Sequence, residues 1–341
     1  MTEKQTGRIA VERLESKALL DNPLGDPATR ELYLYLPPGY DAEPARRFPV
    51  VYCLTGFTGS GVMLLNTQPF TPGLSERMDS LIARGAITEM IVVMPNCFTR
   101  LGGSQYINSD ATGRYEDYLI EEIVPFVDAR FRTLASSGAR AVMGKSSGGY
   151  GALVLGMRHA DVFGLVASHS GDAYFEYCYP PDFIKYVRKI GKGDPRAFLE
   201  KFWREERKDK DDVTLLNVLA MSACYSPDAS QPLGLRLPFD TQTGEIIEEV
   251  WALWLKHDPV RMVERYTEEL RSLRLLYLDA GTRDEFALDI GARILAARLK
   301  ERNIPFVHEE FDDGHFNISY RYDRSLEHIS RAVNAVMVIE K

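Results

Sequence analysis

The segment at residues 144–148 reads Gly-Lys-Ser-Ser-Gly and fits the pattern G-x-S-x-G. A short apolar run at residues 139–143 precedes it, and a stretch with helical spacing at residues 147–159 follows. A serine at such a strand-to-helix turn takes a strained backbone conformation, and the glycines two positions away on either side avoid a clash. The following helix points its N-terminal N–H groups toward the same place. Ser146 is therefore the candidate nucleophile.

Part of this segment also resembles the end of a phosphate-binding loop, G-x-x-x-x-G-K-[ST]. The first glycine of that motif would have to stand at Ala139, and Gly138 lies one position too early. Residues 141–143, where the loop would cradle phosphate, are apolar. The sequence therefore disfavours a nucleotide site, and a glycine-rich turn without chemistry is the other alternative.

A serine nucleophile needs a histidine that takes its proton and an acid that orients the histidine. After an elbow of this type the partners follow in the order serine, acid, histidine. His315 fits this order best, because it follows the last expected strand in the turn sequence Asp-Asp-Gly-His. His169 is a rival, but it precedes every late acid. The remaining histidines lie on helices, within a strand or in an irregular segment, and we expect them to be structural or solvated: His159, His257, His308 and His328.

The acid is expected in the loop after an apolar strand at residues 273–278. Asp284 stands in that loop just before a helix, where its carboxylate can turn toward the histidine, although an aspartate there is also a common helix N-cap. Asp279 is nearer the strand end and is the second candidate, and Asp312 is the third.

Acyl transfer also needs donors that stabilise the oxyanion of the tetrahedral intermediate. The backbone N–H of Ser147, directly after the nucleophile, is one such donor. The second is expected in the loop at residues 55–61, which reads Thr-Gly-Phe-Thr-Gly-Ser-Gly, with the N–H of Phe57 as the candidate. A glycine-rich loop alone is weak evidence, but its position relative to the elbow strengthens the prediction.

These residues require a sheet that brings several strand ends together. Expected strands and helices alternate in the first half of the chain and again after residue 270, which favours a parallel sheet covered by helices on both sides. We expect strands at residues 30–36, 48–54, 90–94, 139–143, 163–167, 273–278 and 305–311, and helices at residues 115–130, 147–159, 285–302 and 323–339. The sequence thus predicts one α/β domain over residues 1–341, with a mostly parallel central sheet.

The alternation stops between about residues 171 and 270, which we interpret as a cap inserted above the catalytic edge. An aromatic stretch near its start, with Tyr174 and Tyr177, could line an apolar substrate pocket or form the core of the cap itself. A charge run at residues 200–212 carries both signs and is expected to be a solvated helix face.

The composition limits the classes of molecule that we expect this chain to bind. The 341 residues are 45% hydrophobic and 26% charged, with a formal net charge of −8, which disfavours binding to nucleic acid. No run of apolar residues is long enough to cross a membrane, and the first residues lack the apolar region of a secretion signal, so we expect a cytoplasmic protein. Four widely spaced cysteines without a C-x-x-C pair indicate reduced structural thiols. We expect no metal or cofactor, and the sequence does not decide whether the chain forms a homo-oligomer.

The chain also resembles the putative-esterase family of α/β hydrolases, which includes esterase D (S-formylglutathione hydrolase), enterochelin esterases, feruloyl esterases and the antigen 85 mycolyltransferases. The elbow Gly-Lys-Ser-Ser-Gly-Gly-Tyr-Gly-Ala, the Thr-Gly-Phe loop, the Gly-Thr-Arg-Asp segment and the late Gly-His carry the resemblance. It implies the α/β-hydrolase fold, the triad Ser146, Asp284 and His315, and Phe57 and Ser147 as oxyanion donors.

Two features depart from the family pattern. Many members have His-Gly before the oxyanion residue, whereas this chain has Thr55 and Gly56, and the inserted cap is not part of the minimal family pattern. We expect Thr55, Gly56, Tyr106 and Asn108 to contact substrate, together with the two cap tyrosines named above.

The leading hypothesis is a serine carboxylesterase that acts on a small ester through an acyl-enzyme. An acyltransferase or a thioesterase with the same triad is the alternative, and a catalytically silent binding module on this fold is the third hypothesis.

Overall fold

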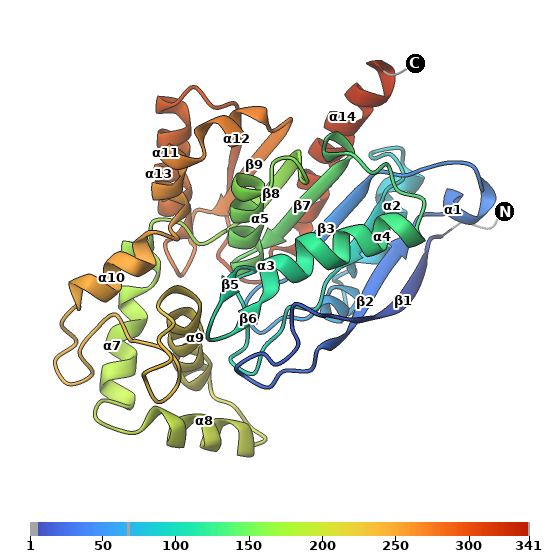
Figure 1. Ribbon diagram of the computed structural model, residues 1–341. Coiled ribbons are helices and arrows are strands. Elements are labelled where there is room, and N and C mark those ends of the chain that lie inside the picture. Colours follow the sequence, from blue (N-terminus) through green and yellow to red (C-terminus); the bar gives the residue numbers. More distant parts are fainter. Residues whose placement is uncertain (1–5, 67–68, 340–341) are drawn as a thin grey trace.

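The computed structural model describes residues 6–66 and 69–339, and its centre is one eight-stranded sheet (Figure 1). The first two strands pair antiparallel with each other, and β2 also pairs antiparallel with β4, whereas all later pairs are parallel. The strand order is β1 (Arg8–Glu15), β2 (Thr29–Leu36), β4 (Ile91–Met94), β3 (Val50–Leu54), β7 (Arg140–Lys145), β8 (Leu165–His169), β9 (Leu275–Gly281) and β10 (Val307–Phe311). The prediction of a mostly parallel sheet is confirmed.

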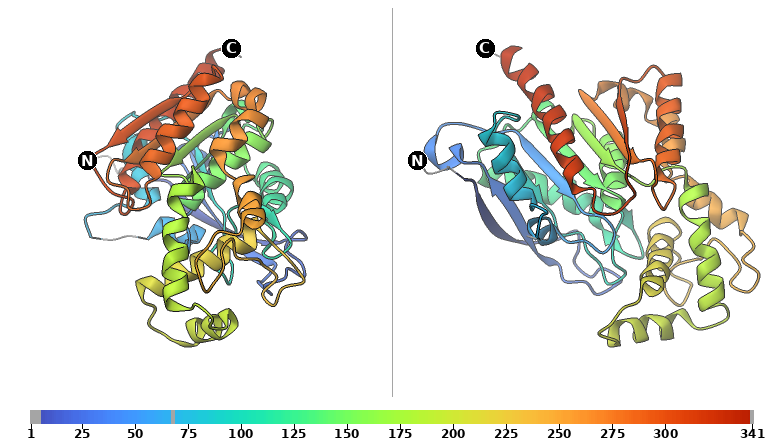
Figure 2. Two further views of the ribbon diagram at one scale, coloured as in Figure 1. Left: turned by 90° about the vertical axis from the view of Figure 1, so that its left-hand side faces the viewer. Right: turned by 180° about the vertical axis from the view of Figure 1, so that it is seen from behind.

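Helices cover both faces of the sheet because the central strands are apolar on both sides. In β3, Val50, Tyr52 and Leu54 pack into one core, and Val51 and Cys53 pack into the other. The second core is closed by α2 (Leu74–Ala83) and α14 (Tyr322–Ile339), which lie on the near face in the right-hand view of Figure 2. The opposite face carries α1 (Gly39–Ala42), α3 (Tyr115–Asp117), α4 (Val124–Arg130), α5 (Ser147–Arg158) and α13 (Leu288–Glu301), together with a small hairpin of β5 (Asn108–Ser109) and β6 (Gly113–Arg114).

Two elements differ from the expectations. The charged N-terminal stretch forms β1, which the sequence analysis missed; it is an edge strand with partly exposed side chains, so it lacks the apolar run of a buried strand. The expected helix at residues 115–130 is divided, because a π-helical segment, Tyr118–Ile123, lies between α3 and α4. Pro125 has no N–H to donate, and the N–H of Val124 bonds to the carbonyl of Leu119 in the wider π pattern.

The segment between β8 and β9 is helical, and its helices α7 to α10 extend beyond the sheet at the lower left of Figure 1. Its helices are α6 (Phe175–Cys178), α7 (Pro180–Lys189), α8 (Pro195–Arg204), α9 (Lys210–Tyr225), α10 (Glu248–Leu255), α11 (Pro259–Arg265) and α12 (Thr267–Ser272). We call residues 171–258 the insert. The last two helices, α11 and α12, pack against the sheet helices α5 and α13, so the cap ends earlier than the predicted residue 270.

Aromatic side chains form the core of the insert. Phe183 stacks on Phe239 at 4.7 Å between ring centroids and meets Trp254 edge-on at 5.4 Å. Tyr225 also packs against Trp254. Of the two roles considered for the aromatic stretch, its own core is the main one.

The parallel register brings five strand ends to one edge of the sheet. Gly144 of β7 lies opposite Leu54 of β3 and Ser168 of β8, and Gly281 of β9 lies opposite Phe311 of β10. The loops that follow these strands therefore meet at the same place, which is the edge that the insert overhangs.

Candidate functional site

Ser146 lies in a tight turn between β7 and α5, with φ 58° and ψ −125°. This positive φ is unfavourable for a residue with a side chain. A Cβ on Gly144 would come within 2.5 Å of the carbonyl carbon of Gly148, and a Cβ on Gly148 would come within 2.3 Å of the Leu54 carbonyl oxygen. The two glycines of the motif are therefore required by close backbone contacts around the serine.

The structure brings Ser146, His315 and Asp284 together at this edge. The Ser146 Oγ lies 3.0 Å from Nε2 of His315, and Nδ1 of the same ring lies 2.8 Å from Oδ2 of Asp284. His315 is 3% exposed, and its backbone N–H donates to the Glu285 carboxylate at 2.6 Å. These distances suit transfer of a proton from the serine to a histidine that the aspartate orients.

Asp284 is held by its own loop as well as by the histidine. Its Oδ1 accepts the N–H of Phe286 at 2.9 Å and that of Leu288 at 3.4 Å. Burial acts to raise the pKa of the Asp284 carboxyl, but the hydrogen bond and charge of His315 and these two N–H groups outweigh it and hold the pKa below its usual value. The carboxylate therefore stays charged beside the imidazole, which it can stabilise when protonated.

The rival residues form a separate buried cluster. Nδ1 of His169 lies 2.7 Å from Asp279, and Nε2 lies 2.9 Å from the hydroxyl of Ser325 on α14. The imidazole and the Asp279 carboxylate are fully buried, and Arg321 donates to Asp279 at 2.9 Å. This second serine–histidine–aspartate array is closed to substrate, so its residue types alone do not make it a site.

The third acid candidate is also separate from the imidazole. Asp312 pairs with Arg283 at 3.2 Å, and 87% of its side chain is exposed. Of the three acids considered, the structure brings only Asp284 to His315.

The two predicted oxyanion donors lie beside the serine. A Cβ on Gly56 would lie 3.4 Å from the Cβ of Ser146, so the loop carrying Phe57 passes close to the nucleophile. Ser147 is the first residue of α5, and its N–H has no acceptor within the helix. The loop is fixed by two backbone bonds, from Thr58 to Gly102 at 2.8 Å and from Gly59 back to Gly56 at 2.9 Å.

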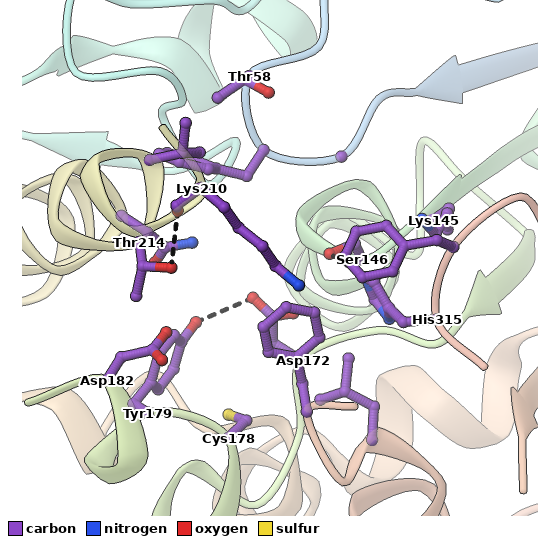
Figure 3. Close-up of a pocket in the computed structure, with 17 residues that line it drawn as sticks. Thr58, Lys145, Ser146, Asp172, Cys178, Tyr179, Asp182, Lys210, Thr214 and His315 are labelled. Carbon is purple, nitrogen blue, oxygen red and sulfur yellow. Dashed lines mark hydrogen bonds between the residues drawn. The ribbon is translucent and has the colours of Figure 1, made fainter. Parts of the chain in front are cut away.

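A cavity of about 530 Å³ opens at this cluster (Figure 3). It is lined by the sheet-edge loops on one side and by α6, α7 and α9 of the insert on the other. The lining residues are Gly56, Phe57, Thr58, Lys145, Ser146, Asp172, Cys178, Tyr179, Asp182, Lys210, Val213, Thr214, Asn217, Phe286, Leu288, His315 and Phe316. The volume suits a small organic molecule.

Several residues expected to contact substrate lie elsewhere. Tyr106 is buried, and its hydroxyl donates to the Thr55 carbonyl at 2.6 Å, so it supports the oxyanion loop from behind. Asn108 accepts from the N–H of Glu116 and donates to Asp117 at the start of α3. Neither residue lines the described pocket, and these polar groups hold loops instead.

Of the other four residues predicted to contact substrate, one lines the cavity and three do not. Gly56 lines the cavity, whereas Thr55 lines a neighbouring hollow of about 370 Å³ on the other side of the loop. Tyr174 and Tyr177 pack on each other at 4.7 Å between ring centroids. Neither lines the cavity, and Tyr174 faces a separate hollow beside α11 instead.

Sequence reasoning missed most of the insert's contribution to the pocket. Tyr179 lies within the aromatic stretch, and its hydroxyl donates to Asp172 at 2.9 Å. Lys210 begins α9 within the charge run that was interpreted as a solvated face. Nothing local marks these residues, since the pocket exists only when the insert folds over the sheet edge.

No three His, Cys, Asp or Glu side chains in residues 6–66 and 69–339 are arranged to hold a metal ion. Within the same ranges, no helix has both the length and the apolar character needed to span a bilayer. All four cysteines are buried and unpaired, as expected for structural thiols.

Comparison with known proteins agrees with this architecture. An endo-1,4-beta-xylanase/feruloyl esterase of Xylanibacter ruminicola is 32% identical over 165 residues, which are 47% of this chain and 22% of that protein. Esterase Rv1288 of Mycobacterium tuberculosis is 36% identical over 85 residues, 25% of this chain and 19% of that protein. The matched region thus spans about a fifth of the length of these curated relatives.

Solved structures share the fold over nearly the whole chain. A ferulic acid esterase has a TM-score of 0.62 at 20% identity, covering 96% of this chain and 99% of its own. An S-formylglutathione hydrolase from Agrobacterium tumefaciens has a TM-score of 0.60 at 16% identity, covering 96% of each chain. Residues 27–328 match the family described as "Putative esterase". That match includes the sheet from β2 to β10, and the chain belongs to this esterase family of α/β hydrolases.

Proposed function

We propose that this protein is a serine carboxylesterase that uses Ser146 as nucleophile, His315 as base and Asp284 as the orienting acid. The observation that carries the proposal is the continuous contact from hydroxyl to imidazole to carboxylate, at 3.0 and 2.8 Å, on the wall of a cavity. Membership of the esterase family supports it.

The reaction follows from these positions. Nε2 of His315 takes the hydroxyl proton as Oγ of Ser146 forms a bond to the ester carbonyl carbon, and the N–H groups of Phe57 and Ser147 stabilise the oxyanion. The imidazolium then protonates the leaving alcohol as the ester C–O bond breaks. Water attacks the acyl-enzyme with the same histidine as base, which releases the carboxylic acid and restores the serine.

The first experiment measures hydrolysis of p-nitrophenyl esters of increasing acyl length, with methyl ferulate included because one relative is named as a feruloyl esterase. Ser146→Ala should lower kcat by at least about 10⁴-fold. Hydrolysis that continues unchanged in this variant would remove Ser146 from the reaction. Turnover of no ester or thioester would instead favour a binding module.

A fluorophosphonate probe gives a second, independent measurement. Peptide mapping should find the label on Ser146, and Ser325 is an internal comparison because it also contacts a histidine but is buried. Label on Ser325 alone would contradict the assignment. Adding excess alcohol and measuring transesterified product separates an acyltransferase from a hydrolase that uses the same residues.

A further inference from the structure

Two lysines from different parts of the chain reach the proposed catalytic pocket. Lys145 is the last residue of β7, directly before Ser146, and Lys210 is the first residue of α9 in the insert. Their ammonium groups lie 5.4 Å and 5.9 Å from the ring centroid of Phe316. Figure 3 shows Lys210 reaching across the pocket toward Asp172 and Ser146. The aromatic ring therefore helps to hold two positive charges close to the nucleophile.

Among the described residues, neither ammonium lies within 4.0 Å of a carboxylate oxygen. The lining acids have other partners: Asp182 pairs with Lys185 at 2.8 Å, and Asp172 accepts from Tyr179 and Gln105 at 2.9 and 3.1 Å. The two cations thus lack a direct counter-charge among the residues that the structure describes.

The two acids near Lys145 are also engaged. Asp284 bonds to the ring of His315, and Glu285 accepts its backbone N–H. Burial lowers the pKa of Lys145 below its usual value, although the charges of Asp284 and Glu285 oppose this. Lys145 is half-buried, and a partly desolvated ammonium without a bonded partner is unfavourable, a cost that a bound anion would relieve.

We propose that the ester acted on at Ser146 carries a carboxylate, which Lys145 and Lys210 bind beside Phe316. This inference rests on the proposed function. A singly charged carboxylate suits the site better than a dianionic phosphate, because acidic side chains also surround the pocket and would repel the second charge. Since Lys145 adjoins the nucleophile, the anionic group lies on the substrate a short chain away from the scissile carbonyl.

The test compares two esters of nearly the same shape, mono-p-nitrophenyl adipate and its methyl ester, p-nitrophenyl methyl adipate. The wild-type protein should have a kcat/KM about tenfold higher for the carboxylate form. Lys210→Glu should reverse this preference, because it replaces an attracting charge with a repelling one. The ratio of the two kcat/KM values cancels any general loss of activity in the variant.

Lys201→Glu is the matched control, since it makes the same change of charge on α8 at a side chain that is 60% exposed and does not line the pocket. It should leave the ratio unchanged. The inference is overturned if the wild type hydrolyses both esters without favouring the carboxylate, if Lys210→Glu keeps the ratio, or if Lys201→Glu reduces it equally. No hydrolysis of either ester, or hydrolysis that survives Ser146→Ala, would contradict the proposed function instead.

Discussion

Asp284→Asn tests the proposed triad most directly, because the substitution keeps the shape of the side chain and changes one hydrogen bond. Oδ1 of Asp284 accepts two backbone N–H groups, from Phe286 and Leu288, so the carbonyl oxygen of asparagine should stay there. The amide NH₂ then faces Nδ1 of His315, 2.8 Å away in the present structure. A donor at that position forces the proton onto Nε2, which can no longer accept the proton of Ser146.

We therefore expect the loss of activity that follows when His315 can no longer act as the general base. A wrong tautomer costs about 10⁴-fold in kcat in a serine protease triad, which corresponds to about 5.4 kcal/mol at the transition state. KM should change little, because Asp284 does not line the cavity. The assay is steady-state hydrolysis of a p-nitrophenyl ester, with circular dichroism and the melting temperature to verify folding.

Asp279→Asn provides the comparison, since it makes the same change in the other histidine–aspartate pair. It should lower the melting temperature, because it weakens the buried bonds to His169 and Arg321, and it should leave kcat per folded molecule near the wild-type value. The reasoning is refuted if Asp284→Asn keeps kcat within tenfold of wild type, or if Asp279→Asn is the variant that abolishes turnover.

Two further predictions concern the loop behind the site and the response to acid. Tyr106→Phe removes the 2.6 Å bond to the Thr55 carbonyl and should lower kcat about tenfold through misplacement of the Phe57 N–H; a rise in KM alone would show instead that Tyr106 contacts substrate. Burial, with a smaller effect of nearby cations, lowers the pKa of His257 from 6.5 to about 4. The unfolded chain therefore binds a proton at this residue more readily than the folded chain does. The free energy of unfolding should consequently fall by roughly 2–3 kcal/mol as the pH drops from 6.5 to 4. Urea unfolding of His257→Phe across this range should show a weaker pH dependence than the wild type, and an identical slope would contradict the assignment.

Much of the architecture was predictable because a parallel strand that is buried on both faces appears in the sequence as a short run of apolar residues. The apolar runs at β3, β4, β7, β8 and β9 were identified to within a few residues. The missed strand β1 lies at the sheet edge, where side chains are partly exposed and no such run is needed. The break in the π-helical segment depends on hydrogen bonding around one proline, which helical periodicity does not reveal.

The elbow could be located from the sequence alone, since the strained backbone at Ser146 requires glycine at positions 144 and 148. The sequence also favoured Asp284 and His315 from their order after the serine, although residue types alone do not separate this pair from His169 and Asp279. His169 and Asp279 lie opposite each other within β8 and β9 and turn toward α14, into the core. Asp284 and His315 stand in the loops beyond the strand ends, and only the register of the sheet brings those loops to Ser146.

The residues that line the pocket were harder to predict from the sequence than the triad. Lys210 and Tyr179 come from the insert, whereas Lys145 and Phe316 come from the sheet edge, and no spacing in the chain relates the two groups. Tyr106 was predicted at the substrate but supports a loop from behind, because a buried hydroxyl must find a hydrogen-bond partner and the Thr55 carbonyl lies 2.6 Å away. Backbone strain and buried strands are local properties that residue types specify, whereas a cavity is the space left between distant segments after they pack.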